Sequence, residues 1–469
     1  MKNKASLAIF SIIISLSLAL APVSTASAIS TGFSTSITYQ NIGSDIAHVT
    51  ILYYADGKTE ATSIVQPDLA VGASQTVSLA NLAPATIGTR GAVVIKSDME
   101  IAVLTTQVPT PTTIKGRGLA SATSSGSSQI WLPNLRKASN GTQVLSIQNL
   151  DSAVADIKLT FYGGASPVSV EKKNIPAGGS AYIDLAEVTG LTIPFIGTAQ
   201  VVTAQSGSTT PGKISGMALH SFGTATEVYA TESISTGGNK LYMPLALCYG
   251  MGGMSTSYYV FNTDATQSAI VTVLYSSGKL ETATLPAHGQ RYFNACTPTG
   301  TVSGYSGSAV ITTNGPAILA VGNIKSNGMA ATFTGQAVGG KKLALPVALY
   351  STANYANGQK SRTTISVMNL GSSLAAGAVK ARYYGRDGTL VGTVSFPAFA
   401  SGSRIDTSAA QLGTAGAEFG YYSNGVNGGS VIIEGLSGSS LVAVAWVVNV
   451  AGPGLYSGET YNAIITAGQ

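Results

Sequence analysis

Residues 148–152 (Gln-Asn-Leu-Asp-Ser) and the run at 157–162 (Ile-Lys-Leu-Thr-Phe-Tyr) decide the fold of this 469-residue chain. In the run, Ile157, Leu159 and Phe161 alternate with polar residues. Alternation with a period of two is typical of a strand whose one face lies on a core and whose other face meets water. The stretch therefore predicts an antiparallel β-structure.

The same pair of motifs occurs four times along the chain, which indicates tandem copies of one module. Each copy has a marker asparagine, and the spacings between the markers are 108, 113 and 107 residues: Asn41, Asn149, Asn262 and Asn369. Each marker is followed by an alternating run that ends in one or two aromatic residues, at 49–54, 157–162, 271–275 and 379–384. A Pro-Ala pair then follows in the last three copies, at 176–177, 286–287 and 397–398.

Modules of about 110 residues built from short strands are typical of two-sheet sandwiches. We therefore predict an all-β protein of four tandem immunoglobulin-like β-sandwich domains after a signal peptide, arranged as a rod. The expected boundaries are 1–28 for the signal peptide and 29–127, 128–238, 239–340 and 341–469 for the four repeats. Outside the signal peptide, no stretch with helical periodicity exceeds about two turns.

The first copy lacks a segment that opens the other three. That segment carries a Leu-Pro or Met-Pro pair and lies at 131–133, 242–244 and 344–346. The first repeat is therefore expected to lack one strand. Two outcomes stay open: an exposed sheet edge that accepts a strand from another chain, or a first repeat that covers its own edge.

The N-terminus has the features of a secretory signal. Lys2 and Lys4 precede an apolar stretch at about 7–20, and an Ala-x-Ala cleavage site lies at 26–28. Loss of the two lysines lowers the formal charge from +5 to +3. We expect a secreted protein, extracellular or held at the cell surface, without a transmembrane span in the mature chain.

The two cysteines, Cys248 and Cys296, fall in the same repeat. An exported chain meets oxidising conditions, so these residues can form a disulfide. Two buried free thiols are the alternative.

The composition excludes two classes of protein. Charged residues make up 10% of the chain, against about 25% in an ordinary domain. Clustered Lys and Arg, which nucleic-acid binding requires, are absent from the sequence. With 45% apolar residues, the chain is also too hydrophobic for a disordered protein.

Candidate catalytic groups are few and scattered. The three histidines, His48, His220 and His288, occupy non-equivalent positions in three copies, and no Ser-His-Asp arrangement is indicated. The Gly-Tyr-Ser-Gly stretch at 304–307 lacks the strand–turn–helix context of a nucleophile elbow. We therefore expect no enzymatic activity, no cofactor and no catalytic metal.

The sequence offers few candidate metal ligands and glycan acceptors. Two cysteines do not supply a zinc site. A calcium ion between repeats stays open, although the turn aspartates stand alone in the sequence: Asp56, Asp264 and Asp387. Asn140 begins an Asn-Gly-Thr glycan acceptor pattern. The marker asparagines are expected to be turn residues, with ligand contact as the alternative.

Several motifs together resemble the tandem immunoglobulin-like repeat proteins of bacterial cell surfaces. They are Leu132-Pro133, Gln148-Asn149-Leu150, Phe161-Tyr162, Pro176-Ala177-Gly178 and Gly307-Ser308-Ala309-Val310. The resemblance implies a surface-layer, adhesive or fibre component and carries over no catalytic residue. The Cys…Trp…Cys core of true immunoglobulin domains is absent, which leaves the strand topology open.

These observations predict an exported, non-catalytic structural protein of the cell surface, a component of an extracellular layer or fibre. Its expected partners are other copies of itself or other envelope proteins, and glycans are a further candidate. The alternative is a carbohydrate- or surface-binding adhesin, which would expose Trp131, Tyr383, Tyr384 and Trp446 together on one face. A secreted hydrolase with accessory sandwiches is disfavoured because the repeats fill the exported chain.

Overall fold

The computed structural model describes most of the chain after the expected signal peptide, which lies outside the described residues. The described ranges are 32–81, 90–110, 116–222, 227–298, 301–326, 329–352, 361–421, 428–452 and 455–466.

The protein is all-β, and its described strands form eight antiparallel sheets. The described helical elements are short: η1 (Leu79–Asn81), α1 (Gly250–Gly253) and η3 (Ala409–Gly416). Across the described ranges, no helix has the length and apolar character that crossing a membrane requires.

The sheets come in pairs along the chain, and each pair is called a unit here. Unit 1 contains β1 (Gly32–Asn41), β2 (Val49–Ala55), β3 (Thr62–Val65), β4 (Ser74–Ser78), β5 (Gly91–Ser97), β6 (Ile101–Thr110) and β7 (Gly118–Ser121). Unit 2 contains β8 (Gln129–Lys137), β9 (Gly141–Asn149), β10 (Ala155–Tyr162), β11 (Val168–Ile175), β12 (Ser180–Asp184), β13 (Phe195–Gln205), β14 (Ile214–Phe222) and β15 (Glu227–Glu232).

Unit 3 contains β16 (Lys240–Cys248), β17 (Ser255–Asn262), β18 (Ala269–Tyr275), β19 (Leu280–Leu285), β20 (Gln290–Asn294), β21 (Tyr305–Asn314), β22 (Ile318–Ser326) and β23 (Met329–Thr334). Unit 4 contains β24 (Lys342–Leu345), β25 (Arg362–Asn369), β26 (Val379–Gly385), β27 (Leu390–Ser395), β28 (Arg404–Thr407), β29 (Gly429–Gly435), β30 (Leu441–Gly452), β31 (Leu455–Asn462) and β32 (Ile464–Ile465).

One strand order recurs in units 2, 3 and 4. In unit 2 the outer sheet has the order β11-β10-β13-β8 and the inner sheet the order β12-β9-β14-β15. The corresponding strands of units 3 and 4 are in the same order, and β32 adds a fifth strand beside β24. The inner sheet of unit 1, β4-β1-β6-β7, also matches, but its outer sheet has only β3-β2-β5. Among the described residues, unit 1 has no strand at the place that β8 holds in unit 2, as the missing opening segment predicts.

The predicted alternation places the core between the paired sheets. In β10, Ile157, Leu159 and Phe161 are buried while Lys158 is exposed. Ile157, Leu159 and Phe161 belong to a buried apolar cluster that also contains Leu145 and other residues of the inner strands. Burial of a large aliphatic or aromatic side chain stabilises the fold by roughly 1.5–3 kcal/mol, so each such run holds its strand in register.

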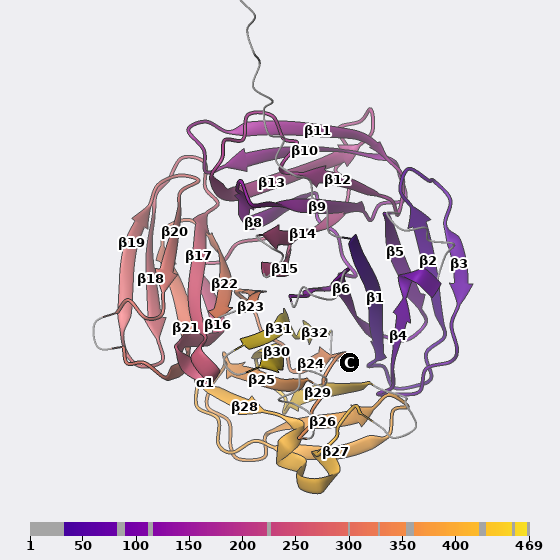
Figure 1. Cartoon of the computed structure of the whole chain (residues 1–469), viewed down its shortest axis with the longest axis vertical. Coiled ribbons are helices and arrows are strands. Elements are labelled where there is room, and N and C mark those ends of the chain that lie inside the picture. The colour runs from indigo at the N-terminus through magenta and orange to yellow at the C-terminus, as the bar shows by residue number, and fades with distance from the viewer. Residues whose placement is uncertain are drawn as a thin grey trace, which may run out of the picture.

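The units form a closed ring, and the predicted rod is wrong. In Figure 1 the chain runs once around an axis, and unit 4, in orange and yellow, lies beside unit 1, in indigo. The backbone N–H of Ser74 in unit 1 donates to the carbonyl of Arg386 in unit 4 at 3.0 Å. Ser430 Oγ in unit 4 donates to the carbonyl of Gly72 at 3.1 Å. The core of unit 4 also includes Leu104 from unit 1.

Candidate functional site

The four marker asparagines hold equivalent turns in the four units. Each is fully buried and is the last residue of the strand that stands second in the order of its unit's inner sheet, namely β1, β9, β17 or β25. Asn149 Nδ2 donates to the carbonyls of Ala153 at 2.8 Å, Ile175 at 3.0 Å and Pro176 at 3.2 Å, and its Oδ1 accepts the N–H of Asp151 at 3.0 Å. Asn41, Asn262 and Asn369 make matching bonds to their own turns.

The marker therefore ties two distant turns together. One is the turn that directly follows the asparagine, and the other is the Pro-Ala turn about 28 residues later along the chain. The backbone carbonyl of Asn149 also accepts the N–H of Gly178 at 3.0 Å, and Asn41 does the same for Gly72 at 2.9 Å. Because this hydrogen-bonding capacity is used within each unit, the marker's role is to shape the second turn.

The two residues of each aromatic pair contact different units. The first member is buried in its own core, as Tyr53, Phe161 and Tyr383 are. The second member lies against the turn of the next unit around the ring. A Cβ on Gly178 would be 2.4 Å from the ring of Tyr54, and a Cβ on Gly72 would be 2.6 Å from the ring of Tyr384.

The same contact recurs at the junction of units 2 and 3 with a different turn residue. The Tyr162 ring centroid is 3.9 Å from that of His288, which occupies the glycine's place with a φ of 50°. At the fourth junction unit 3 has Ser276 in place of a second aromatic residue. Arg404 of unit 4 instead donates to the carbonyl of Gly307 and to Ser306 Oγ of unit 3. Each junction of the ring is thus formed by a side chain from one unit on the backbone or turn of its neighbour.

Replacing Gly72 by alanine tests the closing junction against a matched control, Gly402→Ala. Both glycines have left-handed backbone, with φ of +77° and +70°, but nothing lies within 4 Å of a Cβ on Gly402. Both variants lose about 1 kcal/mol from backbone strain. Gly72→Ala is expected to lose a further 1–3 kcal/mol or so because the methyl group overlaps Tyr384. Urea denaturation measures the difference, and equal losses would show that this junction is not closed in solution.

The last strands of the units meet at the centre of the ring (Figure 1). Thr332 Oγ1 of β23 donates to the Ala230 carbonyl of β15, and Thr460 Oγ1 of β31 donates to the Thr332 carbonyl, both at 2.7 Å. Ser121 Oγ of β7 donates to the Asn462 carbonyl at 3.4 Å, which connects unit 1 to unit 4. A cavity lined by residues of these four strands has a volume of about 10 Å³.

An ion pair between Arg117 and Glu459 joins units 1 and 4. Glu459 is buried, and its carboxylate lies 3.6 Å from the Arg117 guanidinium of unit 1. Burial raises the pKa of Glu459, and the positive charge of Arg117 opposes that rise. The pair therefore supports a contact between units and does not hold a reactive carboxylate in an open site.

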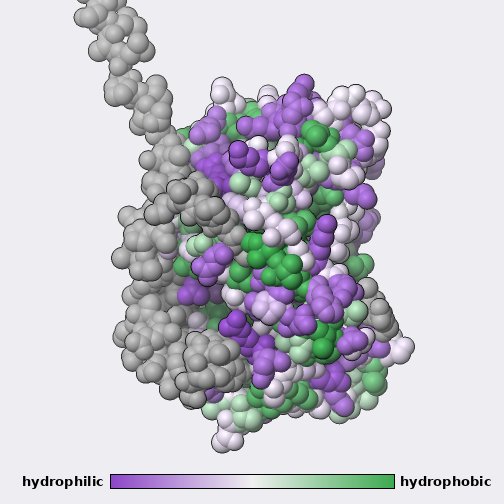
Figure 2. Space-filling view, turned by 90° about the vertical axis from the view of Figure 1, so that its right-hand side faces the viewer, coloured by the Kyte–Doolittle hydropathy of each residue, from purple (hydrophilic) through white to green (hydrophobic). Residues whose placement is uncertain are grey.

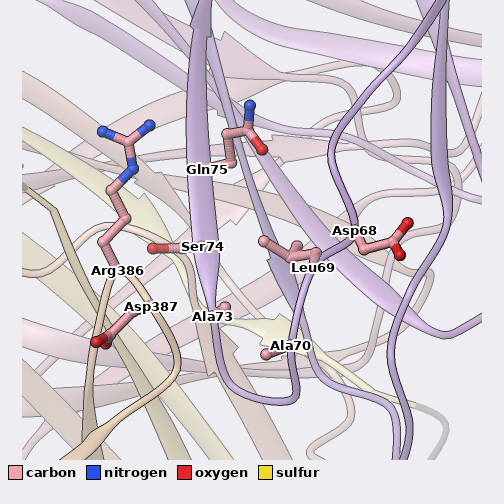
Figure 3. Close-up of a pocket in the computed structure, with 8 residues that line it drawn as sticks. All are labelled: Asp68, Leu69, Ala70, Ala73, Ser74, Gln75, Arg386 and Asp387. Carbon is pink, nitrogen blue, oxygen red and sulfur yellow. The ribbon is translucent and has the colours of Figure 1, made fainter.

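A cavity lies at the junction of units 1 and 4. Its volume is about 390 Å³, and the segments 68–75 and 386–387 line it. Figure 3 shows the Arg386 side chain on one side of the opening and Asp68 on the other, with Asp387 on the Arg386 loop. Asp387 accepts hydrogen bonds from Thr389 at 2.9 Å, which lowers the pKa of Asp387. The residues that line this cavity include no histidine, cysteine or lysine.

The three histidines lie in three different units and have different surroundings. His48 is exposed and pairs with Asp98, and that hydrogen bond raises the pKa of His48. His288 packs on Tyr162 at a junction. His220 is fully buried in unit 2, stacked on Tyr229 with ring centroids 3.8 Å apart.

His220 predicts a pH dependence of stability. Burial, together with the positive charges of Arg136 and Lys325, lowers the pKa of His220 well below 6.5. The unfolded chain therefore takes up a proton first as the pH falls below 6.5, and the stability contributed by neutral His220 is lost. Between pH 7.5 and 5.5 we expect a loss of about 1.4 kcal/mol that His220→Gln lacks. Urea titrations of the unmodified protein and of His220→Gln at both pH values measure it, and an equal loss of stability in the two proteins would contradict it.

The structure joins Cys248 and Cys296 by a disulfide, with an S–S distance of 2.10 Å. Cys248 ends β16 in the outer sheet and Cys296 follows β20 in the inner sheet, so the bond links the two sheets of unit 3. Within the described residues, no three His, Cys, Asp or Glu side chains gather into a metal-binding group. Asp264 accepts from the N–H groups of Thr266 and Gln267 in its own turn at 2.8 Å.

The aromatic residues proposed as a sugar platform do not share an exposed face. Trp131, Tyr383 and Trp446 are 3%, 1% and 6% exposed. Tyr384 lies half-buried against Gly72. The glycan-binding alternative therefore loses the residues on which it was based.

Sequence reasoning found the markers but missed the junction residues. The second aromatic, the turn glycine and Arg404 look like strand and turn residues when each copy is examined alone. The available signal was the recurrence of a second aromatic residue at the end of the run in three of the four copies, at positions 54, 162 and 384.

Comparisons with known proteins identify no family. No family model matches the sequence, and no curated protein matches it. One solved structure with a low-probability match is described as a "tetra-tandem repeat in extending region of large adhesion protein". It shares 11% identity, covering 93% of this chain and 96% of that chain, with a TM-score of 0.10. At that TM-score the likeness carries no argument about fold or function.

Proposed function

We propose that this is an exported, non-catalytic structural protein of the cell surface, and that each unit is an immunoglobulin-like domain derived from one repeat. The observation that carries the proposal is that the side chains that recur in the repeats make structural contacts within and between units. The marker asparagines shape turns, and the second aromatics or Arg404 join neighbouring units. A module whose repeated residues hold one ring together is suited to a building block.

The surface chemistry supports assembly into a layer or fibre. Charged residues are only 10% of the chain, and the mature chain has a formal charge of about +3. Low net charge favours association, and few long charged side chains are immobilised when surfaces meet. Figure 2 views the side of the ring formed by unit 1 and shows apolar residues among polar ones near the middle of that side. Other copies of the chain or other envelope proteins are the proposed partners.

Two measurements test this proposal together. Antibody labelling of intact source cells is expected to detect the protein at the surface, and lysed cells are the control. Purified residues 29–469, examined by sedimentation velocity and negative-stain microscopy over a concentration series, are expected to form ordered assemblies of rings. Labelling only after lysis, or single rings at every concentration with no affinity for envelope fractions, would contradict the proposal.

A further inference from the structure

Strand β5 is an edge strand in a place where the other units have a paired one. In units 2, 3 and 4 the corresponding strands are hydrogen-bonded on both sides: β13 to β10 and β8, β21 to β18 and β16, and β29 to β26 and β24. β5 pairs with β2 alone. Among the described residues, no strand lies on its other side.

The missing strand leaves the core of unit 1 partly open. Val93 and Ile95 of β5 are half-buried, whereas the residues at the same register in the other units are 0% exposed: Ala199, Val201, Ala309, Ile311, Val431 and Ile433. Ile101 of β6 is also half-buried, while its equivalents are at most 1% exposed: Ile214, Ile318 and Leu441. The unpaired edge is therefore flanked by partly exposed apolar side chains, and this edge with Val93, Ile95 and Ile101 is called the groove here.

The backbone of β5 offers hydrogen bonds to this groove. In an antiparallel ladder alternate residues direct N–H and C=O away from the partner strand. The carbonyls of Gly91 and Val93 accept from Tyr182 Oη at 2.7 Å and Gln148 Nε2 at 3.3 Å, both side chains of unit 2. The backbone N–H and C=O groups of Val93 and Ile95 thus point away from β2, and a strand could pair with them after displacing only the longer of those two bonds.

The chain itself shows what fits such a groove. In unit 2, Ile130 lies opposite Val201 and Leu132 opposite Ala199, and Pro133 follows. In units 3 and 4 the same places are held by Leu241 and Met243 and by Leu343 and Leu345, each pair followed by proline. The shared pattern is Ile or Leu, any residue, Leu or Met, then Pro. It occurs only at these three places in the sequence, and all three are already paired within this chain.

We propose that β5 accepts an antiparallel strand donated by another polypeptide, with this pattern placed so that its first apolar residue faces Ile95 and its second faces Val93. Such strand addition gains main-chain hydrogen bonds and fills the groove with alternate side chains. The inference is independent of the proposed function, since an acceptor groove would also operate in a protein that forms no layer.

A synthetic peptide with the sequence of residues 240–247 tests the proposal on the purified protein by amide hydrogen exchange. We expect saturable binding and at least tenfold slower exchange in β5, with no change in β3 at the other edge of the same sheet. A peptide with aspartate in place of Leu241 and Met243 is the control and should not bind. Ile95→Pro should abolish binding, because proline removes an N–H that faces the groove and not β2; circular dichroism checks that the variant remains folded.

Two results would overturn the proposal. One is unchanged β5 exchange at saturating peptide in a protein that otherwise folds. The other is full protection of β5 in the free protein, which would assign the groove to residues of this chain.

A grafted strand gives a second readout. β8, β16 and β24 each begin eight residues after the preceding strand ends. The 240–247 sequence appended after Gln469 would begin at the same distance from the end of β31, next to unit 1 in the ring. The graft is expected to raise Tm by several degrees and to protect β5, and an aspartate-substituted graft should do neither. A graft without effect on either measure would contradict the proposal.

Discussion

Replacement of Asn149 by alanine is expected to lower the free energy of unfolding of unit 2 by about 3 kcal/mol. The change removes the donor to the carbonyls of Ala153, Ile175 and Pro176 and the acceptor for Asp151. The Ile175 bond is buried, so water does not replace the donor that is lost there. Each lost hydrogen bond costs about 1 kcal/mol, and the turn held by Gly178 would loosen as well.

Urea denaturation measures the effect. Because a ring of several units need not unfold in one step, amide hydrogen exchange of the unit 2 strands serves as a local probe. Asn140→Ala is the matched control, since Asn140 is exposed in the same unit. A loss in Asn149→Ala no larger than in the control would mean that the marker does not hold the turn.

Removal of the disulfide by Cys248→Ser with Cys296→Ser is expected to destabilise unit 3 by about 4 kcal/mol. The bond closes a loop of 48 residues, and opening it restores conformational freedom to the unfolded chain. It also releases the link between the outer and inner sheets. Chemical denaturation of the double variant measures the loss.

Reduction of the unmodified protein provides the control for the two serines. A reductant should lower the unfolding midpoint of the unmodified protein to that of the double variant and leave the variant unchanged. Equal midpoints for the oxidised protein and the variant would show that the bond does not form or does not stabilise unit 3.

Local regularities made the strands and their faces predictable. The alternation in 157–162 fixed which side chains enter the core, and β10 shows that pattern with Ile157, Leu159 and Phe161 buried. The missing opening segment likewise predicted the three-stranded outer sheet of unit 1. Both inferences need only periodicity and comparison among copies, which a single sequence supplies.

The ring could not be predicted in the same way. Its junctions join residues of different copies that are far apart in the sequence, such as Tyr54 with Gly178 and Tyr384 with Gly72. A second aromatic next to a turn has the same local pattern whether it meets solvent or a neighbouring unit. The direction in which each unit follows the last depends on those contacts, so the rod was as consistent with the local sequence as the ring.

Small-angle X-ray scattering of purified residues 29–469, measured at low concentration and extrapolated to infinite dilution, tests the closed ring most directly. A ring in which units 1 and 4 touch predicts a radius of gyration of about 22–25 Å, close to that of a compact chain of this length. Four units of about 13 Å radius of gyration strung end to end would give roughly 40 Å, and that result would contradict the ring.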